Sequence, residues 1–355
     1  MGGFFITLKK RIFYLDFVRA FAISLIVLAH VSHSFVYPHI HGGSNWYLPT
    51  FFNIFSLMGV PLFLMISGTL LLNKDIVLGD FLKKRLSRVL IPFIFWALLF
   101  PFFKLFVLQQ TVSVKSGFLD ILRIYWFVFM IVGVYMILPI INSFIKEYKI
   151  SGLEYFLVIW LVVLVFNTLG ISYPKSFSLF YHLTGYVGYV VLGYYLSVKQ
   201  FKFTDSQMIK IGLILCLVFL VIDYAYTLHI SPHKGDILRF HYGTIVPALQ
   251  SAGFFIFIRY FDKYCNSHKD TIKNKIYSLF KDTFLFKIIL ALSISSYGIF
   301  LVHYFVHDTA RHIFPKLFDR NILLPVMYIL ILFCTWLIVY VLSKIPYLKY
   351  ISGAH

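Results

Sequence analysis

Long apolar runs, separated by short polar connections, follow one another along almost the whole chain. A helix needs about 20 mainly apolar residues to cross the roughly 30 Å of hydrocarbon in a bilayer. Runs of this length lie near residues 13–36, 50–73, 89–109, 123–145, 152–171, 178–198, 208–228, 241–260, 288–310 and 322–343. Strands of a membrane barrel would instead alternate over about ten residues. The pattern predicts an all-α, polytopic transmembrane bundle of about ten helices, a single domain over residues 1–355 with no appended soluble domain.

Composition agrees with this fold class. The chain is 60% hydrophobic and only 13% charged, whereas a soluble globular chain carries about 25% charged residues. The first apolar run contains Asp16 and Arg19 and lacks a cleavage site of small residues. It therefore reads as a retained helix and not as a signal peptide.

The net charge of +18 indicates membrane topology more than a nucleic-acid partner. If the N-terminus is cytoplasmic, most lysines and arginines fall in connections on the inner side, as the positive-inside rule expects. The same bias predicts that both termini are cytoplasmic, which requires an even number of crossings. We expect a multi-pass protein of the cell membrane that contacts membrane lipids and binds no nucleic acid.

The first run carries charged residues that are costly inside a membrane. Each of Asp16 and Arg19 would cost about 2.5–3.5 kcal/mol at mid-helix, which makes such residues candidates for function. Their i,i+3 spacing also allows a simple ion pair. His30 follows Arg19 by eleven residues, so the two are about 20° apart around a helix and about 16 Å apart along it. One face thus presents a permanent cation and, further out, an imidazole that could act as a general base for a hydroxyl.

Six stretches, in order and over nearly the whole chain, carry a family resemblance. They are Tyr14 to His30, Gly59 to Gly68, Phe81 to Trp96, Trp126 to Pro139, Gly185 to Tyr195, and Ser295 to His303. Together they resemble the membrane acyltransferase-3 family, whose first helix carries Arg-x10-His and whose next inner loop carries Arg-x-x-Arg. The resemblance implies transfer of an acyl group, usually acetyl from acetyl-CoA, to sugar hydroxyls of surface polysaccharides or glycolipids.

The resemblance also implies roles for particular residues. Arg19 and His30 match the catalytic pair, and Arg85 and Arg88 match the Arg-x-x-Arg that would bind the donor. Asp16 stands where the family often has an acidic residue, and His303 matches a late histidine; both are auxiliary candidates. No cofactor is expected to be bound permanently, because acyl-CoA is a substrate. The acceptor is a surface glycan or lipid-linked saccharide, reached directly or through a separate acyl-accepting partner protein.

The expected chemistry suits these residues. Arginine binds phosphate as a planar fork, so Arg85 and Arg88 suit the nucleotide of a cytosolic donor; topology anchoring by inner cations is the alternative. The uncharged pantetheine arm could run beside Arg19, and His30 would take the proton of the attacking hydroxyl. A relay through an acylated histidine remains open. A transporter of polysaccharide or glycolipid without acyl-transfer chemistry, and a membrane scaffold, are the rival functions.

Histidines gather on the predicted outer side, with His268 and His355 as the exceptions. Three interpretations stay open: tolerated interfacial residues, contacts to an incoming polysaccharide, or zinc ligands. His303 and His307 share a helix face, a spacing that suits a metal pair. No cysteine joins them in sequence, and no metal site is predicted.

Overall fold

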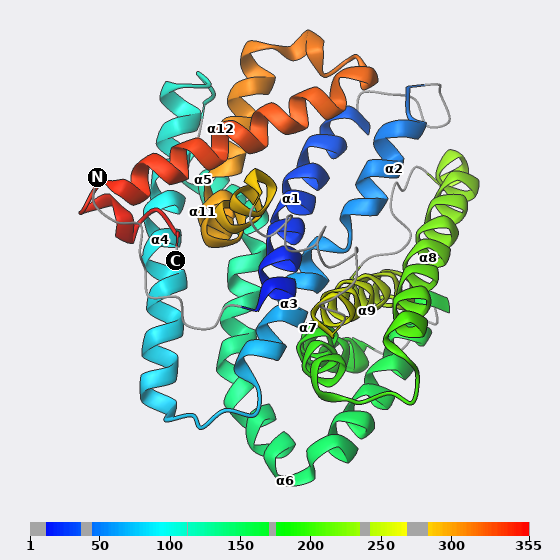
Figure 1. The fold of residues 1–355 in the computed structure, drawn as a ribbon. Helices are drawn as coiled ribbons and strands as arrows, with labels where there is room; N and C mark the ends of the chain where they lie inside the picture. Colours follow the sequence, from blue (N-terminus) through cyan, green and yellow to red (C-terminus); the bar gives the residue numbers. More distant parts are fainter. Residues whose placement is uncertain are drawn as a thin grey trace.

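The computed structural model describes residues 12–36, 45–111, 113–169, 175–234, 242–267 and 283–354 (Figure 1). Within these residues every regular element is helical, as predicted. The α-helices are α1 (Phe13–Val36), α2 (Tyr47–Ser56), α3 (Gly59–Leu71), α4 (Leu78–Phe106), α5 (Val114–Ile124), α6 (Trp126–Leu169), α7 (Lys175–Val198), α8 (Asp205–Lys234), α9 (Ile245–Ser267), α11 (Phe284–Ile313) and α12 (Leu324–Lys344). Short 3-10 turns, η1 (Pro315–Leu317), η2 (Asn321–Leu323) and η3 (Leu348–Tyr350), flank α12.

Each of the ten apolar runs falls on a helix. Helices α2 and α3 share one run, and the 44 residues of α6 carry two. At 1.5 Å per residue α6 is about 66 Å long, about twice the hydrocarbon thickness. It bends at Lys149, which has non-helical backbone angles, and the bend lies at the bottom of Figure 1. Among the described residues, seven helical segments are long and apolar enough to cross a membrane by themselves.

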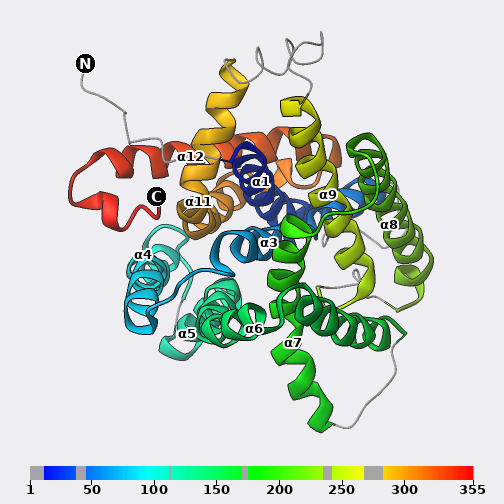
Figure 2. The same ribbon diagram turned by 60° about the horizontal axis from the view of Figure 1, so that its bottom comes forward.

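Helix α1 lies inside the bundle and packs against α2, α3, α9, α11 and α12. In Figure 1, α12 crosses in front of α11, and α4 and α8 stand on opposite sides. Figure 2 shows α4, α5 and α6 grouped together, with α8 and α9 paired elsewhere. Small residues allow close approach between membrane helices: a Cβ on Gly68 of α3 would collide with the backbone of Val190 in α7.

One end of the bundle gathers connections that the charge pattern assigns to the inner side. Asn142 of α6 donates a hydrogen bond to the Lys74 carbonyl (2.8 Å) and accepts one from its backbone N–H (3.3 Å). Lys146 pairs with Asp75 at 2.6 Å, and this hydrogen bond lowers the pKa of the Asp75 carboxyl. The α3–α4 connection and the bend of α6 therefore lie side by side. The cytoplasmic orientation of this end remains a prediction.

Candidate active site

Helices α1 and α11 run side by side in the same direction. The Ser293 hydroxyl of α11 donates a hydrogen bond to the Asp16 carboxylate near the start of α1 (2.7 Å). Further along both helices, the Tyr304 hydroxyl lies 2.9 Å from Nδ1 of His30. From the first contact to the second, residue numbers increase along both helices, so the two helices are parallel. Asp16, predicted as auxiliary, thus fixes the register of α11 against the helix that carries the predicted catalytic pair.

The two arginines predicted to bind the donor and Arg19 of the predicted catalytic pair line one cavity. This arginine cavity has a volume of about 700 Å³, and Arg19, Arg85 and Arg88 all border it. The guanidinium of Arg19 lies 3.8 Å from the carboxylate of Asp16, so the i,i+3 pair that the spacing allows is present. The rest of the wall is mostly apolar and aromatic, and includes Ile26, Phe63, Ile66, Phe127, Tyr297 and Phe300. The cavity therefore combines cationic groups with an apolar lining.

The predicted base and the late histidine lie together beyond this cavity. The ring centroids of His30 and His303 are 5.1 Å apart. Tyr304 packs against both, with centroids 4.6 Å from His30 and 4.5 Å from His303. His303 is fully buried, whereas His30 keeps part of its surface exposed. The fold thus joins two histidines that are far apart in the sequence into one cluster with Tyr304.

The hydrogen bonds of His303 assign its neutral tautomer. Its Nδ1 atom lies 2.7 Å from the carbonyl oxygen of Phe300 and 3.1 Å from that of Ile299. A carbonyl only accepts, so Nδ1 must carry the proton and donate. The lone pair of the neutral ring is therefore on Nε2, which is buried without a hydrogen-bond partner among the described residues. An imidazole held in this way can accept a proton or a hydrogen bond from a ligand.

Arg19 and the two imidazoles occupy two levels along α1 and α11, and Arg85 and Arg88 reach the first of these levels from α4. Ile26 lines the arginine cavity and lies one helical turn before His30. Phe300 also lines it and lies one turn before His303. His30 itself does not border the cavity. The wall of the arginine cavity therefore ends about one helical turn before the two imidazoles.

The i,i+4 pair proposed as a possible metal pair is engaged in other contacts. His307 lies 2.9 Å from the Ser34 hydroxyl and 3.0 Å from the Asp308 carboxylate. Within the described part of the chain, no group of three or more His, Cys, Asp or Glu side chains is placed to hold a metal ion. Of the outer histidines, His39, His41 and His241 lie outside the described residues.

Sequence reasoning missed two residues of α11 that contact α1. Ser293 and Tyr304 are the direct partners of Asp16 and His30, yet neither drew attention. Their spacing held a usable signal, because residues eleven apart share a helix face. Arg19 and His30 have the same spacing in α1. The spacing marks a polar face on each helix, but it does not tell which faces meet.

Comparison with known proteins agrees with the resemblance seen in the sequence. A family model described as an acyltransferase domain, of the acyltransferase-3 type, matches residues 12–344. The chain belongs to this acyltransferase family. The residues that line the arginine cavity and those of the histidine cluster lie within the matched range, apart from Gly353 of the cavity wall.

Two curated relatives of this family member are both called nodulation protein NolL. The protein from Sinorhizobium fredii is 29% identical over 136 residues, which cover 36% of each chain. The protein from Mesorhizobium japonicum is 25% identical over 137 residues, covering 36% of this chain and 35% of the relative. The chain thus matches only about a third of the length of these relatives. No solved structure matches.

Proposed function

We propose that this family member is an integral O-acyltransferase of the cell membrane. It transfers acetyl from acetyl-CoA to a hydroxyl of a cell-surface polysaccharide or lipid-linked sugar. The observation that supports this best is the arrangement of Arg19, Arg85 and Arg88 around one cavity, one helical level below the His30–His303 pair. A glycan transporter or a scaffold would not require guanidinium groups and imidazoles to line up in this way.

The arginine cavity suits an acyl-CoA. The phosphates of acyl-CoA carry several negative charges, and a guanidinium can bind phosphate oxygens through two parallel N–H bonds. Arg85 and Arg88 lie on one face of α4, near its first turns. The apolar wall formed by Ile26, Phe127 and Phe300 suits the uncharged pantetheine arm. The thioester would then lie near the top of the cavity, toward His30.

The transfer step needs a base beside the thioester. The oxygen of the sugar hydroxyl attacks the carbonyl carbon, and the C–S bond to CoA breaks as the new C–O bond forms. His30 takes the hydroxyl proton and passes it to the departing thiolate, so that free CoA thiol is the second product. Tyr304 holds the His30 ring through its hydroxyl. A relay through an acylated histidine would give the same products, but would leave labelled enzyme when no acceptor is present.

The test is direct transfer by the purified protein. The protein in liposomes receives acetyl-CoA labelled in the acetyl group, together with glycans extracted from cells that lack the gene. Label that appears as an ester on the glycan, with one CoA thiol released per ester, supports the proposal. If glycan crosses the liposome membrane but never carries label, the transporter interpretation replaces it. Mass spectrometry of surface glycans from cells with and without the gene identifies the acylated sugar. It also detects any product formed through a separate acyl-accepting partner protein.

A further inference from the structure

A second cavity lies next to the arginine cavity and has no role in the proposal above. It has a volume of about 830 Å³ and lies between α4, α11, α12 and the tail formed by residues 345–354. We call it the tail cavity. The described residues that line it include four cations, Arg88, Lys287, Lys344 and Lys349, and no acidic residue. Four cations around one cavity favour an anionic ligand.

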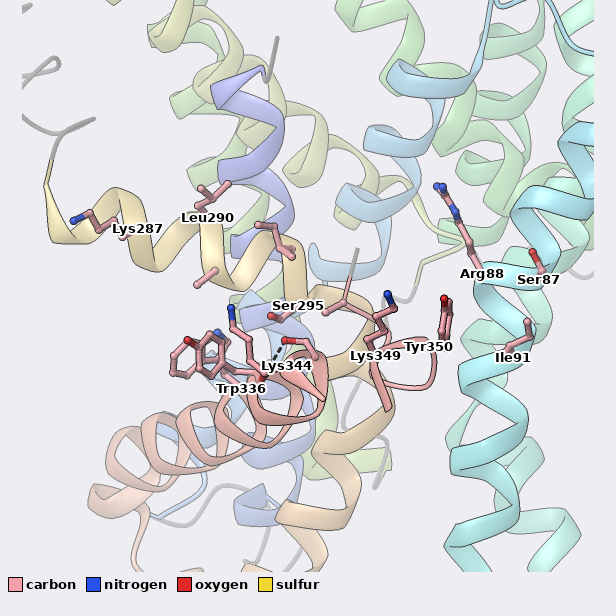
Figure 3. A pocket seen from close by; sticks show the side chains of 15 residues that line it. Ser87, Arg88, Ile91, Lys287, Leu290, Ser295, Trp336, Lys344, Lys349 and Tyr350 are labelled. Atoms are coloured by element: carbon pink, nitrogen blue, oxygen red, sulfur yellow. Dashed lines mark hydrogen bonds between the residues drawn. The ribbon is translucent and has the colours of Figure 1, made fainter. Parts of the chain in front are cut away.

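Aromatic rings accompany these cations. Trp336 stacks on Tyr340 with ring centroids 5.3 Å apart, and both line the tail cavity with Tyr350. In Figure 3, Lys344 and Lys349 point to the same side as Tyr350, and Arg88 reaches from α4 on the far side of that ring. Aromatic faces next to cations are the combination that proteins use to stack a nucleobase and hold its phosphates.

The two cavities adjoin. Arg88 and Ile294 line both of them. The tail forms part of the partition, because Gly353 borders the arginine cavity and Ala354 borders the tail cavity. A ligand that passes beside Arg88 can therefore extend from one cavity into the other.

The tail is held in place by specific contacts. The indole N–H of Trp96 in α4 donates a hydrogen bond to the Ile351 carbonyl (2.9 Å). Next to it, a Cβ on Gly298 of α11 would collide with the carbonyl oxygen of Ser352. Gly353 adopts φ +68, a conformation that glycine reaches at little cost. The tail also lies beyond residues 12–344, the range that the family model matches.

We propose that the tail cavity binds the nucleotide end of the acyl-CoA donor. The adenine base stacks against Tyr350 or Trp336. The phosphates nearest the base contact Lys344 and Lys349, and the remaining phosphates contact Arg88 and Arg85 where the two cavities adjoin. The pantetheine arm then passes Arg88 into the arginine cavity. This assignment rests on the proposed function, since it names the site for one part of the same donor. The phosphate of an anionic phospholipid headgroup has the same chemistry, so the test must distinguish the two sources.

The experiment compares two double variants that lose the same charge. Lys344→Gln/Lys349→Gln changes the tail cavity, and Lys83→Gln/Lys84→Gln changes two exposed lysines of α4 that border neither cavity. The dissociation constants of acetyl-CoA and of acetyl-pantetheine, which lacks the nucleotide, are measured for each protein in detergent. We expect the first variant to bind acetyl-CoA at least about tenfold more weakly, equivalent to about 1.4 kcal/mol. Its affinity for acetyl-pantetheine should not change, and the control should match the wild type for both ligands.

Each other outcome has a definite meaning. If the wild type binds neither ligand, the proposed function fails and the assignment fails with it. If the wild type binds acetyl-CoA but Lys344→Gln/Lys349→Gln binds it equally well, the assignment alone is wrong. Equal losses of affinity for acetyl-CoA and acetyl-pantetheine also overturn the assignment, because the lysines would then not bind the nucleotide. Native mass spectrometry that finds phosphatidylglycerol on the wild type and not on the variant, with unchanged acetyl-CoA affinity, makes the cavity a lipid site.

A second variant covers the case in which the double variant is not monodisperse. Tyr350→Ala removes an exposed ring of the tail that lines the tail cavity and leaves every cation in place. It should weaken acetyl-CoA but not acetyl-pantetheine, since stacking of a base on an aromatic ring contributes about 1–3 kcal/mol. Unchanged acetyl-CoA affinity, combined with unchanged affinity in Trp336→Ala, would overturn the stacking site.

Discussion

Replacing His30 by alanine tests the central element of the site. The imidazole is the predicted acceptor of the hydroxyl proton, and general-base catalysis contributes about 10²–10⁴-fold. We therefore expect His30→Ala to lower the rate of acyl transfer by at least about 10²-fold. Donor affinity should not change, because Arg19, Arg85 and Arg88 line the arginine cavity one level away. Transfer should also fall in acid, because a protonated imidazole cannot accept a proton.

Tyr304→Phe gives a smaller effect whose size follows from the structure. It removes the hydroxyl that lies 2.9 Å from Nδ1 of His30 but keeps the ring packed against both histidines. A neutral hydrogen bond contributes about 0.5–1.5 kcal/mol net. At 1.36 kcal/mol per tenfold, the rate should fall by about 2- to 13-fold. If Tyr304 acts only by holding His30, then His30→Ala/Tyr304→Phe should be no slower than His30→Ala.

The assay is single-turnover transfer of labelled acetyl to glycan, with acetyl-CoA affinity measured on the same samples. His303→Ala is measured as well, because the Nε2 atom of His303 could also accept the hydroxyl proton. This atom is buried and has no hydrogen-bond partner among the described residues. Near-normal transfer by His30→Ala together with complete loss in His303→Ala would place the base on α11 and refute the reasoning. A loss in Tyr304→Phe as large as in His30→Ala would instead make the phenol a reacting group.

Three further predictions follow from the same geometry. Arg85→Gln/Arg88→Gln should weaken acetyl-CoA binding by at least about tenfold. Arg85→Lys/Arg88→Lys should keep only part of the wild-type affinity, because lysine lacks the planar fork with which a guanidinium binds phosphate. If Arg85→Gln/Arg88→Gln binds acetyl-CoA as tightly as the wild type, these arginines are topology anchors. A reporter inserted after Gln110 should read extracytoplasmic and one after Lys74 cytoplasmic, and the reverse pattern would contradict the assigned orientation. Asn142→Ala should destabilise the fold by about 1–3 kcal/mol in thermal unfolding, because two hydrogen bonds to Lys74 are lost; an unchanged melting temperature would contradict this.

The sequence predicted the helices because hydrophobic length determines which segments can cross a bilayer. It also predicted that Arg19 and His30 share a face, since this depends only on helical geometry. Asp16 illustrates the limit of such reasoning. The spacing allowed a pair with Arg19, which forms at 3.8 Å, but the closer partner is Ser293, 277 residues away. Contacts between distant helices depend on packing, which periodicity does not encode.

The same limit applies to the histidine cluster and the cavities. The sequence around His303 does not indicate that His30 is its neighbour across the bundle. Nor does it indicate that the Nδ1 atom of His303 is hydrogen-bonded to a carbonyl of its own helix. The tail was harder still to interpret. The charge pattern assigns Lys344 and Lys349 only to the inner side, and their place in a cavity with Arg88 appears once α4, α12 and the tail converge.

The parallel arrangement of α1 and α11 bears on the number of membrane crossings. The segments that satisfy the length and composition test between these two helices are Tyr47–Leu71, Leu78–Phe106, Trp126–Leu169 and Asp205–His229. After α1, four single crossings would bring the chain back to the side where α1 ends, and α11 would then run antiparallel to α1. The contacts between α1 and α11 show instead that the two helices run in the same direction. An odd number is therefore required. Counting α6 twice, on either side of its bend at Lys149, and adding α7 and α9 gives seven. With α1, α11 and α12 the total is ten, an even number, which predicts that α1 begins and α12 ends on the same side of the membrane.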